Sequence, residues 1–344
     1  MATLQVFGAG GFARDLARAF TAHGDTVTGF LTSGPPAVDT LDGLPVHQAS
    51  ASTLAEGPVA IGVFNRESHS DYAAVAAWLR ARRPDIPLLW PQDTYARLQP
   101  TLGERFWLAA PAQLAAQAHD IAAARALFDP VSHATFDALI AFRQHAHDAP
   151  PPPDPDLQYL PDWLAAELAT RGPMRLVDGG AYRGETLTAL AARLPIAQAW
   201  SFEPDPDNHA ALVAALADWP IPATHIPAGL SDHCGLADFQ AGAGEASHFG
   251  GQGGRPTPVV SLDACLHLAP VNFIKLDVEG QELAVLAGAR RTLQRERPAL
   301  AIAAYHRWDD LWRLPLFLAE LGLGYRLRLG LHGHNSFDTV LYAY

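Results

Sequence analysis

Lysine is almost absent from this chain. Of its 24 lysine and arginine side chains, all but Lys275 are arginine. A lysine kept against such a bias indicates a position where a compact ammonium does what a planar guanidinium cannot. Cysteine is scarce as well. Cys234 and Cys265 lack metal-ligand spacing and allow at most one disulfide, so we expect a reducing, cytoplasmic environment.

Positive charge and long apolar runs are also lacking. The formal net charge is -12, which argues against nucleic acid or an anionic membrane as the main partner. No apolar run reaches the roughly 20 residues that span a bilayer. The first residues lack the basic region and apolar core of a signal peptide. We therefore expect a soluble protein with no membrane insertion, acting on a small or neutral substrate.

The first hundred residues alternate strand and helix patterns. Apolar runs at 4–7, 26–31, 59–64 and 87–90 enclose helical patterns at 12–23 and 70–83. This alternation predicts a small parallel, Rossmann-like α/β domain over residues 1–100. Residues 101–158 are predicted to be a helical region that ends in a proline-rich linker at 148–155.

A second α/β domain is predicted over residues 159–344. Its expected strands are 176–178, 199–203, 224–226, 273–277 and 300–303, and its expected helices are 185–193, 207–217, 281–295 and 309–321. Residues 325–331 and 339–344 leave no room for a helix between them, so they should pair as an antiparallel hairpin. The glycine-rich stretch 241–258 is expected to be a loop that covers the site.

A glycine loop follows the first strand of this second domain, in Val177-Asp-Gly-Gly-Ala-Tyr-Arg-Gly184. Glycine lets the backbone turn tightly and approach a ligand. The acid at the start of the loop would repel phosphate and attract a cationic ligand, such as the amino group or sulfonium of S-adenosylmethionine. A structural glycine turn is the alternative. The candidate ligand-binding residues here are Asp178, Gly179, Gly180, Ala181 and Tyr182.

Two further segments are candidates for the rest of an adenosyl site. Glu203 ends the next strand, roughly 20–25 residues after the glycine loop, where an acid binds ribose hydroxyls. It could instead cap the following helix, although Asp205 or Asp207 could fill that role. After the third strand, Ser231 and Asp232 could contact the adenine edge or form an ordinary Asx turn.

The segment Phe273-Ile-Lys-Leu-Asp-Val-Glu-Gly280 carries the candidates for chemistry. On a strand Lys275 and Asp277 point to one face, at the edge where open α/β sheets place ligands. Asp277 could take a proton from a hydroxyl nucleophile, or His306 could do so instead. Lys275 could lower the nucleophile pKa, or pair structurally with a carboxylate, and Glu279 borders the same point.

We expect no metal, because no tight ligand spacing is visible. A set made of His332 and His334 with Asp277 and His306 is the alternative.

Together these motifs resemble the FkbM family of S-adenosylmethionine-dependent methyltransferases. The resemblance rests on residues 177–186, 202–205, 261–263, 273–282, 305–306 and 338–342. It implies a class I methyltransferase fold, with a seven-stranded sheet ending in an antiparallel hairpin. It also implies O-methylation of a hydroxyl on a sugar, glycan precursor or related metabolite. By position it makes Asp178, Gly180 and Glu203 cofactor ligands and places Asp277 and Glu279 beside the reaction centre.

The N-terminal domain is similar to the Rossmann-like domain that precedes bacterial sugar O-acyltransferases, through residues 7–12, 29–30, 44–46 and 61–62. Its loop Gly8-Ala-Gly-Gly11 leaves two other functions open. One is an NAD-linked sugar oxidoreductase, although the strand at 26–33 lacks the terminal acid that binds an NAD ribose. The other is a non-catalytic nucleotide or sugar-nucleotide binding module. A homo-oligomer is possible.

Overall fold

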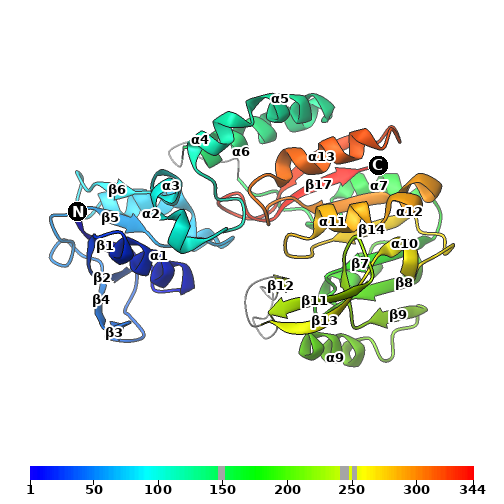
Figure 1. Ribbon diagram of the computed structural model, residues 1–344, viewed down its shortest axis with the longest axis horizontal. Coiled ribbons are helices and arrows are strands. Elements are labelled where there is room, and N and C mark those ends of the chain that lie inside the picture. The colour runs from blue at the N-terminus through cyan, green and yellow to red at the C-terminus, as the bar shows by residue number, and fades with distance from the viewer. Residues whose placement is uncertain (146–151, 241–247, 250–253) are drawn as a thin grey trace. The chain divides into compact units, whose positions relative to one another are not determined.

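The chain forms two compact units. The computed structural model describes residues 1–145, 152–240, 248–249 and 254–344 (Figure 1). Unit 1 consists of residues 1–119, 134–153 and 333–338, and unit 2 consists of residues 120–133, 154–332 and 339–344. Each unit is therefore built from stretches that are separated in the sequence.

Unit 1 is centred on a six-stranded sheet of order β3-β4-β2-β1-β5-β6. All neighbours pair in parallel except β3 and β4. Short apolar runs supply the central strands, and every residue of β5 is buried, as a strand covered on both faces requires. The strands are β1 Thr3–Phe7, β2 Thr26–Thr32, β3 Thr40–Leu41, β4 Leu44–Gln48, β5 Val59–Ile61 and β6 Leu88–Leu89.

The four N-terminal strands predicted from the sequence are present, and the small antiparallel pair β3–β4 was not anticipated. The helices of unit 1 are α1 Gly11–Ala22, η1 Ser68–Ser70, α2 Tyr72–Arg80, α3 Pro91–Leu102, α4 Pro111–Ala116 and α6 His133–Gln144. Of these, α1, α2 and α3 lie beside the sheet (Figure 1). Since α4, α5 and α6 occupy most of 111–144, the prediction of a helical region there is confirmed.

Unit 2 contains the predicted seven-stranded sheet with a terminal antiparallel hairpin. Its order is β16-β17-β15-β14-β7-β8-β9. β7, β8, β9, β14 and β15 pair in parallel, whereas β17 runs antiparallel to both β15 and β16. The strands are β7 Met174–Gly179, β8 Ile196–Phe202, β9 Ala223–Ile226, β14 Phe273–Leu276, β15 Ala299–Ala303, β16 Leu327–Leu331 and β17 Thr339–Ala343.

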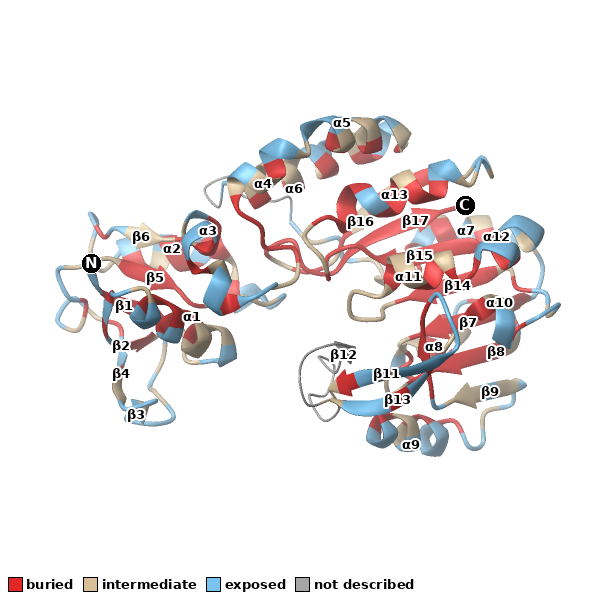
Figure 2. Cartoon of the chain, viewed as in Figure 1, coloured by how far each residue is buried: buried red, intermediate tan, exposed pale blue. Residues whose placement is uncertain are grey.

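Helices cover the faces of this sheet, and strands β14 and β15 are buried throughout (Figure 2). One face packs Leu176, Phe273 and Ala301 against leucines of α7 and α8. The helices and short turns of unit 2 are α5 Ala118–Leu127, η2 Pro130–Ser132, α7 Asp162–Ala169, α8 Glu185–Ala191, α9 Pro206–Ala215, α10 Leu262–Cys265, α11 Glu282–Ala287, α12 Arg290–Glu296 and α13 Asp310–Glu320.

The single helix predicted over 281–295 is wrong, because the structure divides it into α11 and α12. Gly288 lies at the break. A Cβ added there would lie 2.2 Å from the carbonyl oxygen of Ser231. The helix is thus interrupted where its backbone lies against the backbone of Ser231.

The loop predicted over 241–258 is partly wrong. Arg255–Val260 forms β13, which pairs with β11 (Gly235–Gln240) and β10 (Gly229–Leu230) in a small four-stranded sheet that also holds β12 (His248–Phe249). Thr257 and Val259 are the buried positions of β13, so alternate side chains face inward despite two prolines. Residues 241–247 and 250–253 lie outside the described residues.

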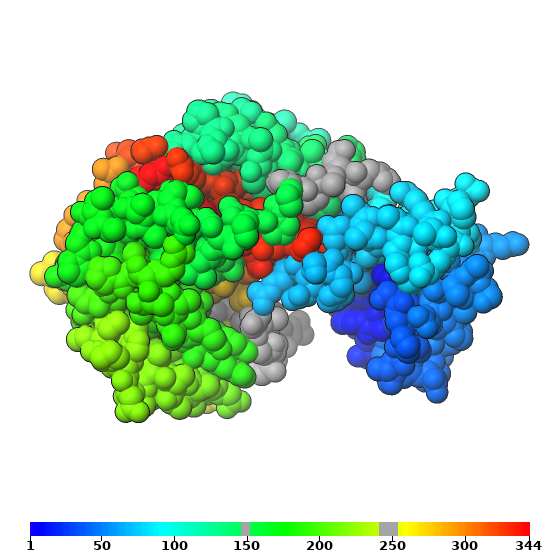
Figure 3. Space-filling model, turned by 180° about the vertical axis from the view of Figure 1, so that it is seen from behind, coloured from blue at the N-terminus to red at the C-terminus, as the bar shows by residue number. Residues whose placement is uncertain are grey.

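The extended segment before α7 runs along the C-terminal hairpin of unit 2. The Asp154 N–H donates to the carbonyl of Leu331 at 2.6 Å, and the Tyr342 hydroxyl donates to the carbonyl of Gln158. In Figure 3 this green segment crosses the red hairpin. Among the helices of the described ranges, none combines the length and the apolar character needed to cross a bilayer.

Candidate functional site

The glycine loop after β7 is held tightly against the end of β14. Gly180 has φ +72, and a Cβ there would lie 1.8 Å from the carbonyl oxygen of Asp277. Tyr182 also has a positive φ of 49. No residue other than glycine fits position 180 without moving the backbone. The loop from Asp178 to Tyr182 therefore lies at the carboxyl edge of the two central strands, as the sequence predicted.

Glu203 is bound to this loop through its carboxylate. Its Oε2 accepts the Tyr182 N–H at 2.8 Å, and its Oε1 accepts the Asp205 N–H at 2.9 Å. Burial raises the pKa of Glu203 to about 7, against the effect of these two amides. Asp205 is the cap of α9, accepting from the amides of Asp207 and Asn208. The sequence expectation that Asp205 could fill the capping role is thus confirmed.

Lys275 and Asp178 form a buried ion pair beneath the glycine loop. Their Nζ and Oδ1 atoms are 3.0 Å apart, and the side chains are 1% and 0% exposed. Burial lowers the pKa of Lys275, but the charges of Asp178 and Asp277 outweigh it and raise that pKa. Burial raises the pKa of Asp178, and Lys275 opposes this rise. The structural pairing of Lys275 with a carboxylate, which the sequence left open, is therefore present.

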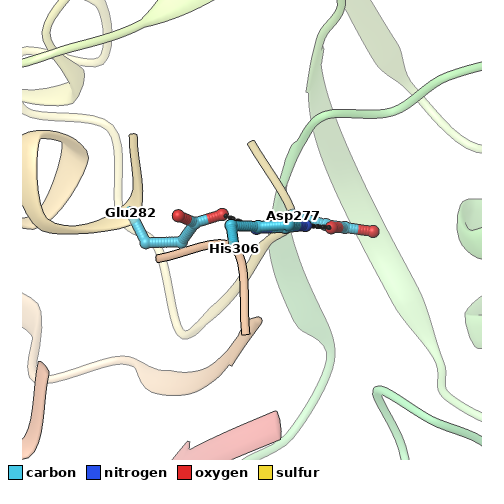
Figure 4. Close-up of side chains that lie close together, drawn as sticks. All are labelled: Asp277, Glu282 and His306. Carbon is cyan, nitrogen blue, oxygen red and sulfur yellow. Dashed lines mark hydrogen bonds and ion pairs between the residues drawn. The ribbon is translucent and has the colours of Figure 1, made fainter. Parts of the chain in front are cut away.

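His306 lies between two carboxylates at the end of β15 (Figure 4). Its Nδ1 is 2.7 Å from Oε1 of Glu282, and its Nε2 is 3.3 Å from Oδ1 of Asp277. Glu279 reaches Nε2 at 3.8 Å. The imidazole is 1% exposed, whereas Asp277 and Glu279 are 28% and 23% exposed. Nε2 of His306, although itself buried, thus faces the two more exposed carboxylates.

Charge around His306 favours its protonated form. Burial alone lowers the pKa of His306, but the charges of Glu282, Glu279 and Asp277 outweigh it and raise the pKa well above its ordinary value. Burial, and then the charge of Glu282, raise the pKa of neighbouring Asp310 to about 8. Perturbed titratable groups gather at functional sites, and here they gather around Glu282 and His306.

Ser231 and Asp232 lie apart from these hydrogen bonds, between β10 and β11. Ser231 is buried and donates its hydroxyl to Oδ1 of Asp232 at 3.2 Å. Asp232 is 57% exposed and lies 2.6 Å from Nδ1 of His233. Both interpretations of Ser231 and Asp232, a contact with the adenine edge and an Asx turn, stay predictions.

The described residues contain one group of side chains with metal-ligand geometry, namely Asp277, Glu282 and His306, whose ligand atoms lie within 4.8 Å of one another. Both imidazole nitrogens of His306 face carboxylates. The set with His332 and His334 is wrong. His332 contacts the Tyr342 hydroxyl at 2.7 Å, and His334 contacts Asp71 at 3.2 Å.

Sequence reasoning did not identify Glu282 as a site residue. It is fully buried, and its Oε1 accepts the Val278 N–H at 2.9 Å as well as facing His306. The available signal was its position five residues after Asp277 within the quoted motif. A buried glutamate at the start of an otherwise apolar helix is unusual, because a buried carboxylate needs a hydrogen-bond or ion-pair partner.

Comparison with known proteins places a family model over this site. Residues 178–327 match the model described as methyltransferase FkbM domain. This match includes the glycine loop from Asp178 onward and Glu203. It also includes His306 with its neighbours Asp277, Glu279 and Glu282, which we call the His306 cluster. The match does not extend to the residues before 178. The comparison with curated proteins gave no match.

The fold is shared with a solved structure, the methyltransferase FkbM from Methylobacillus flagellatus KT. It is 21% identical, with TM-score 0.77, covering 100% of this chain and 90% of that chain. At that identity the likeness concerns the fold alone. A precorrin-6y C5,15-methyltransferase from Geobacter metallireducens GS-15 is 12% identical, with TM-score 0.34, over 54% of this chain and 88% of that one. Aeropyrum pernix fibrillarin with bound S-adenosyl-L-methionine is 13% identical, with TM-score 0.33, over 50% and 66%.

Proposed function

Because residues 178–327 form a methyltransferase FkbM domain, we propose that this domain binds S-adenosylmethionine and methylates a hydroxyl group of an acceptor. The observation that carries the proposal is the convergence of three features at one sheet edge. These are the glycine loop against β14, the Glu203 carboxylate bound to that loop, and the His306 cluster.

The proposed cofactor site fits an adenosyl group. Each oxygen of Glu203 accepts one backbone amide, which leaves a further lone pair on each for a ribose hydroxyl. Gly179 and Gly180 leave no room for a side chain, because an added Cβ would lie 2.9 Å from Leu230 and 1.8 Å from the carbonyl oxygen of Asp277. We propose that this loop, with Ala181, offers its backbone to the ligand. Ser231 and Asp232 are proposed for the adenine edge. Asp178 is fully buried, so we assign it to the support of the loop.

When bound, S-adenosylmethionine supplies an electrophilic methyl group on sulfur. The acceptor oxygen must lose its proton as it attacks. We assign that proton to Nε2 of His306, the nitrogen that faces the more exposed Asp277 and Glu279. Glu282 holds Nδ1 at 2.7 Å, which fixes the orientation of the ring and stabilises the imidazolium that forms. We assign to Asp277 the orientation of the acceptor hydroxyl.

A sugar, glycan precursor or related metabolite is the proposed acceptor. Carboxylates such as Asp277 and Glu279 accept hydrogen bonds from neighbouring hydroxyls. A net charge of -12 disfavours polyanionic acceptors. The resemblance of the N-terminal domain to that of sugar O-acyltransferases points the same way, as an analogy only.

An NAD-linked oxidoreductase is less well supported. Its usual tyrosine–lysine couple would need a lysine near the N-terminal glycine loop. The one lysine of the chain, Lys275, is in unit 2 and is bonded to Gly180.

Replacement of Asp277 by asparagine tests the reaction centre. Asp277→Asn keeps the shape of the side chain and removes its charge. We expect it to lower methyl transfer by at least about 100-fold, a typical contribution of acid–base and orienting groups, and to leave the Kd for S-adenosylmethionine unchanged. Transfer is measured with isotopically labelled methyl donor over a panel of sugars and sugar nucleotides. Asp207→Asn, an exposed carboxylate at the start of α9, is the matched control. Unchanged turnover in Asp277→Asn removes this residue from the mechanism.

A further inference from the structure

The ammonium of Lys275 is surrounded by three oxygens of one short segment. Nζ donates to the carbonyl of Gly180 at 2.6 Å and to the carbonyl of Gly179 at 3.2 Å, and it lies 3.0 Å from Oδ1 of Asp178. An ammonium has three N–H donors. The donors and the surrounding oxygens thus match in number, and all three oxygens belong to consecutive residues at the end of β7.

This surrounding explains why lysine is kept at position 275 in a chain that otherwise uses arginine. Lys275 of β14 is the register partner of Asp178 of β7, so its side chain lies next to the start of the glycine loop. The Tyr159 ring lies 5.2 Å from Nζ. A guanidinium is planar and wider, and its fork cannot direct three donors to three oxygens around one point. At 1% exposure, Lys275 offers no surface to an acceptor.

The contacts of Lys275 fix which way the loop peptides point. The Gly180 carbonyl turns inward to Nζ, and the N–H of the same peptide, that of Ala181, donates to the carbonyl of Phe202 at 3.1 Å. The next amide, that of Tyr182, donates to Glu203. Release of the carbonyls would free the peptides that hold Glu203 in place.

We propose that Lys275 is a positioning residue. Its buried ammonium holds the glycine loop in its ligand-binding conformation and does not contact the acceptor. This inference rests on the proposed function, because the ligand of that loop is taken to be S-adenosylmethionine. Its consequence is specific. Loss of Lys275 weakens cofactor binding through the loop, and the effect appears in the Kd of the methyl donor.

The test compares Lys275→Met and Lys275→Arg with the unchanged protein. Lys275→Met keeps the length of the side chain and removes its charge and donors, and Lys275→Arg keeps the charge. We expect the Kd for S-adenosylmethionine, measured by titration calorimetry, to rise at least about tenfold in Lys275→Met, the loss expected for hydrogen bonds from a charged donor. Lys275→Arg should not restore the affinity.

A second measurement needs no ligand. Hydrogen exchange of the peptide spanning residues 178–184 should be at least about tenfold faster in Lys275→Met, because opening of the loop then costs less free energy. If Lys275→Met leaves Asp178 uncompensated and does not fold, the double variant Lys275→Met/Asp178→Asn carries the same test without a buried unpaired charge.

Ile274→Val is the matched control for a merely structural role. Ile274 is 1% exposed and adjacent on β14, and the change removes one methylene without touching the loop. We expect it to lower the melting temperature while the Kd and the loop exchange stay unchanged. The proposal is overturned if Lys275→Met also changes only the melting temperature. If the unchanged protein does not bind S-adenosylmethionine, the proposed function fails, and the exchange measurement still decides whether Lys275 holds the loop.

Discussion

In the proposed function Glu203 both holds the glycine loop and binds the ribose, and a change of pH should separate these two roles. It must be ionised to accept ribose hydroxyls, yet burial raises its pKa to about 7. We therefore predict that the affinity for S-adenosylmethionine weakens as the pH falls through 7. The Kd should rise about tenfold when this acceptor is protonated, as measured by calorimetry between pH 6 and 8.

In Glu203→Gln the affinity should be low and independent of pH over the same range, because the amide does not titrate. Asp207→Asn serves as the control, since this neighbouring acid is exposed at the start of α9. A pH dependence that persists in Glu203→Gln assigns the titration to another group and contradicts the ribose assignment.

His306 gives a second prediction, on the rate of transfer. As a proton acceptor it must be neutral, but the surrounding carboxylates raise its pKa well above its ordinary value. The value of kcat/KM should therefore rise with pH until His306 is deprotonated. Glu282 is the strongest of the groups that raise this pKa, so Glu282→Gln should shift the rise toward lower pH.

Glu279→Gln is the comparison for this pH profile, because Glu279 lies farther from the ring at 3.8 Å. It should shift the rise in the same direction by a smaller amount. An identical profile in Glu282→Gln and the unchanged protein means that His306 is not the group that limits the rate.

For single residues, the sequence predicted the motif residues of the candidate site but did not predict which side chains they contact. The alternation of a strand places Lys275 and Asp277 at the same edge, which a pattern can show. It cannot show that Lys275 pairs with Asp178 or that His306 meets Glu282, because those contacts depend on the pairing of β14 with β7 and on the turn after β14. The sequence likewise predicts Asp178 as a ligand-binding residue, whereas its side chain is fully buried in the structure.

Among the elements, the break between α11 and α12 is tied to the site. Gly288 touches the backbone of Ser231 and Asp232, the candidates for the adenine edge. Gly288→Ala should lower the free energy of unfolding by about 1–3 kcal/mol, the usual cost of overpacking a rigid contact. It should also weaken the binding of S-adenosylmethionine, because Ser231 must move.

The control for Gly288→Ala is Gly235→Ala, whose added Cβ would meet only the His233 side chain at 3.4 Å. Thermal unfolding and calorimetry on both variants are the measurements. Equal stability of Gly288→Ala and the unchanged protein would show that the contact is soft and does not set the break.

Hydrophobic periodicity predicted most of the longer helices and strands, because these bury one continuous face or both faces. It did not predict α3 or β11. The prediction failed where a contact with residues distant in the sequence determines the secondary structure. The apolar pattern continues beyond Gly288, so the local stop signal that this C-cap glycine gives was outweighed in the prediction. The pair β3–β4 and strand β13 are short or rich in proline and glycine, and their pairing partners alone make them strands.

For the whole molecule, the tip of the C-terminal hairpin is the least expected feature. Residues 333–338 belong to unit 1. Within that unit Asn335 is fully buried, its Oδ1 accepts the Tyr72 N–H at 3.0 Å, and its Nδ2 donates to the carbonyls of Ser70 and Asn65. These bonds satisfy the backbone at the start of α2.

Asn335→Ala should therefore destabilise unit 1 by about 2–4 kcal/mol, since buried polar groups lose their partners. A φ of +55 at this position adds to the cost for alanine. Asn65→Ala is the control, because its side chain accepts only the exposed Glu67 amide. Calorimetric unfolding that is unaltered in Asn335→Ala would show that the tip contributes little to unit 1.

No composition signal predicts that this short tip joins unit 1. A boundary inferred from prolines or from the change of strand pattern divides the chain once, whereas each compact unit here is assembled from three stretches. The burial of Asn335 and Ser336, both with positive φ, is a tertiary property. In the sequence His334-Asn-Ser-Phe337 is typical of an ordinary hairpin turn.

We propose that the glycine loop of unit 2 and Glu203 form a site for S-adenosylmethionine. The most direct measurement is calorimetric titration of the purified protein with S-adenosylmethionine and, separately, with NAD, together with Glu203→Ala. We expect a Kd in the micromolar range for the methyl donor, no heat with NAD, and at least about tenfold weaker binding in Glu203→Ala. Binding of NAD without any response to S-adenosylmethionine would rule out this site and move the active site to the loop at Gly8–Gly11.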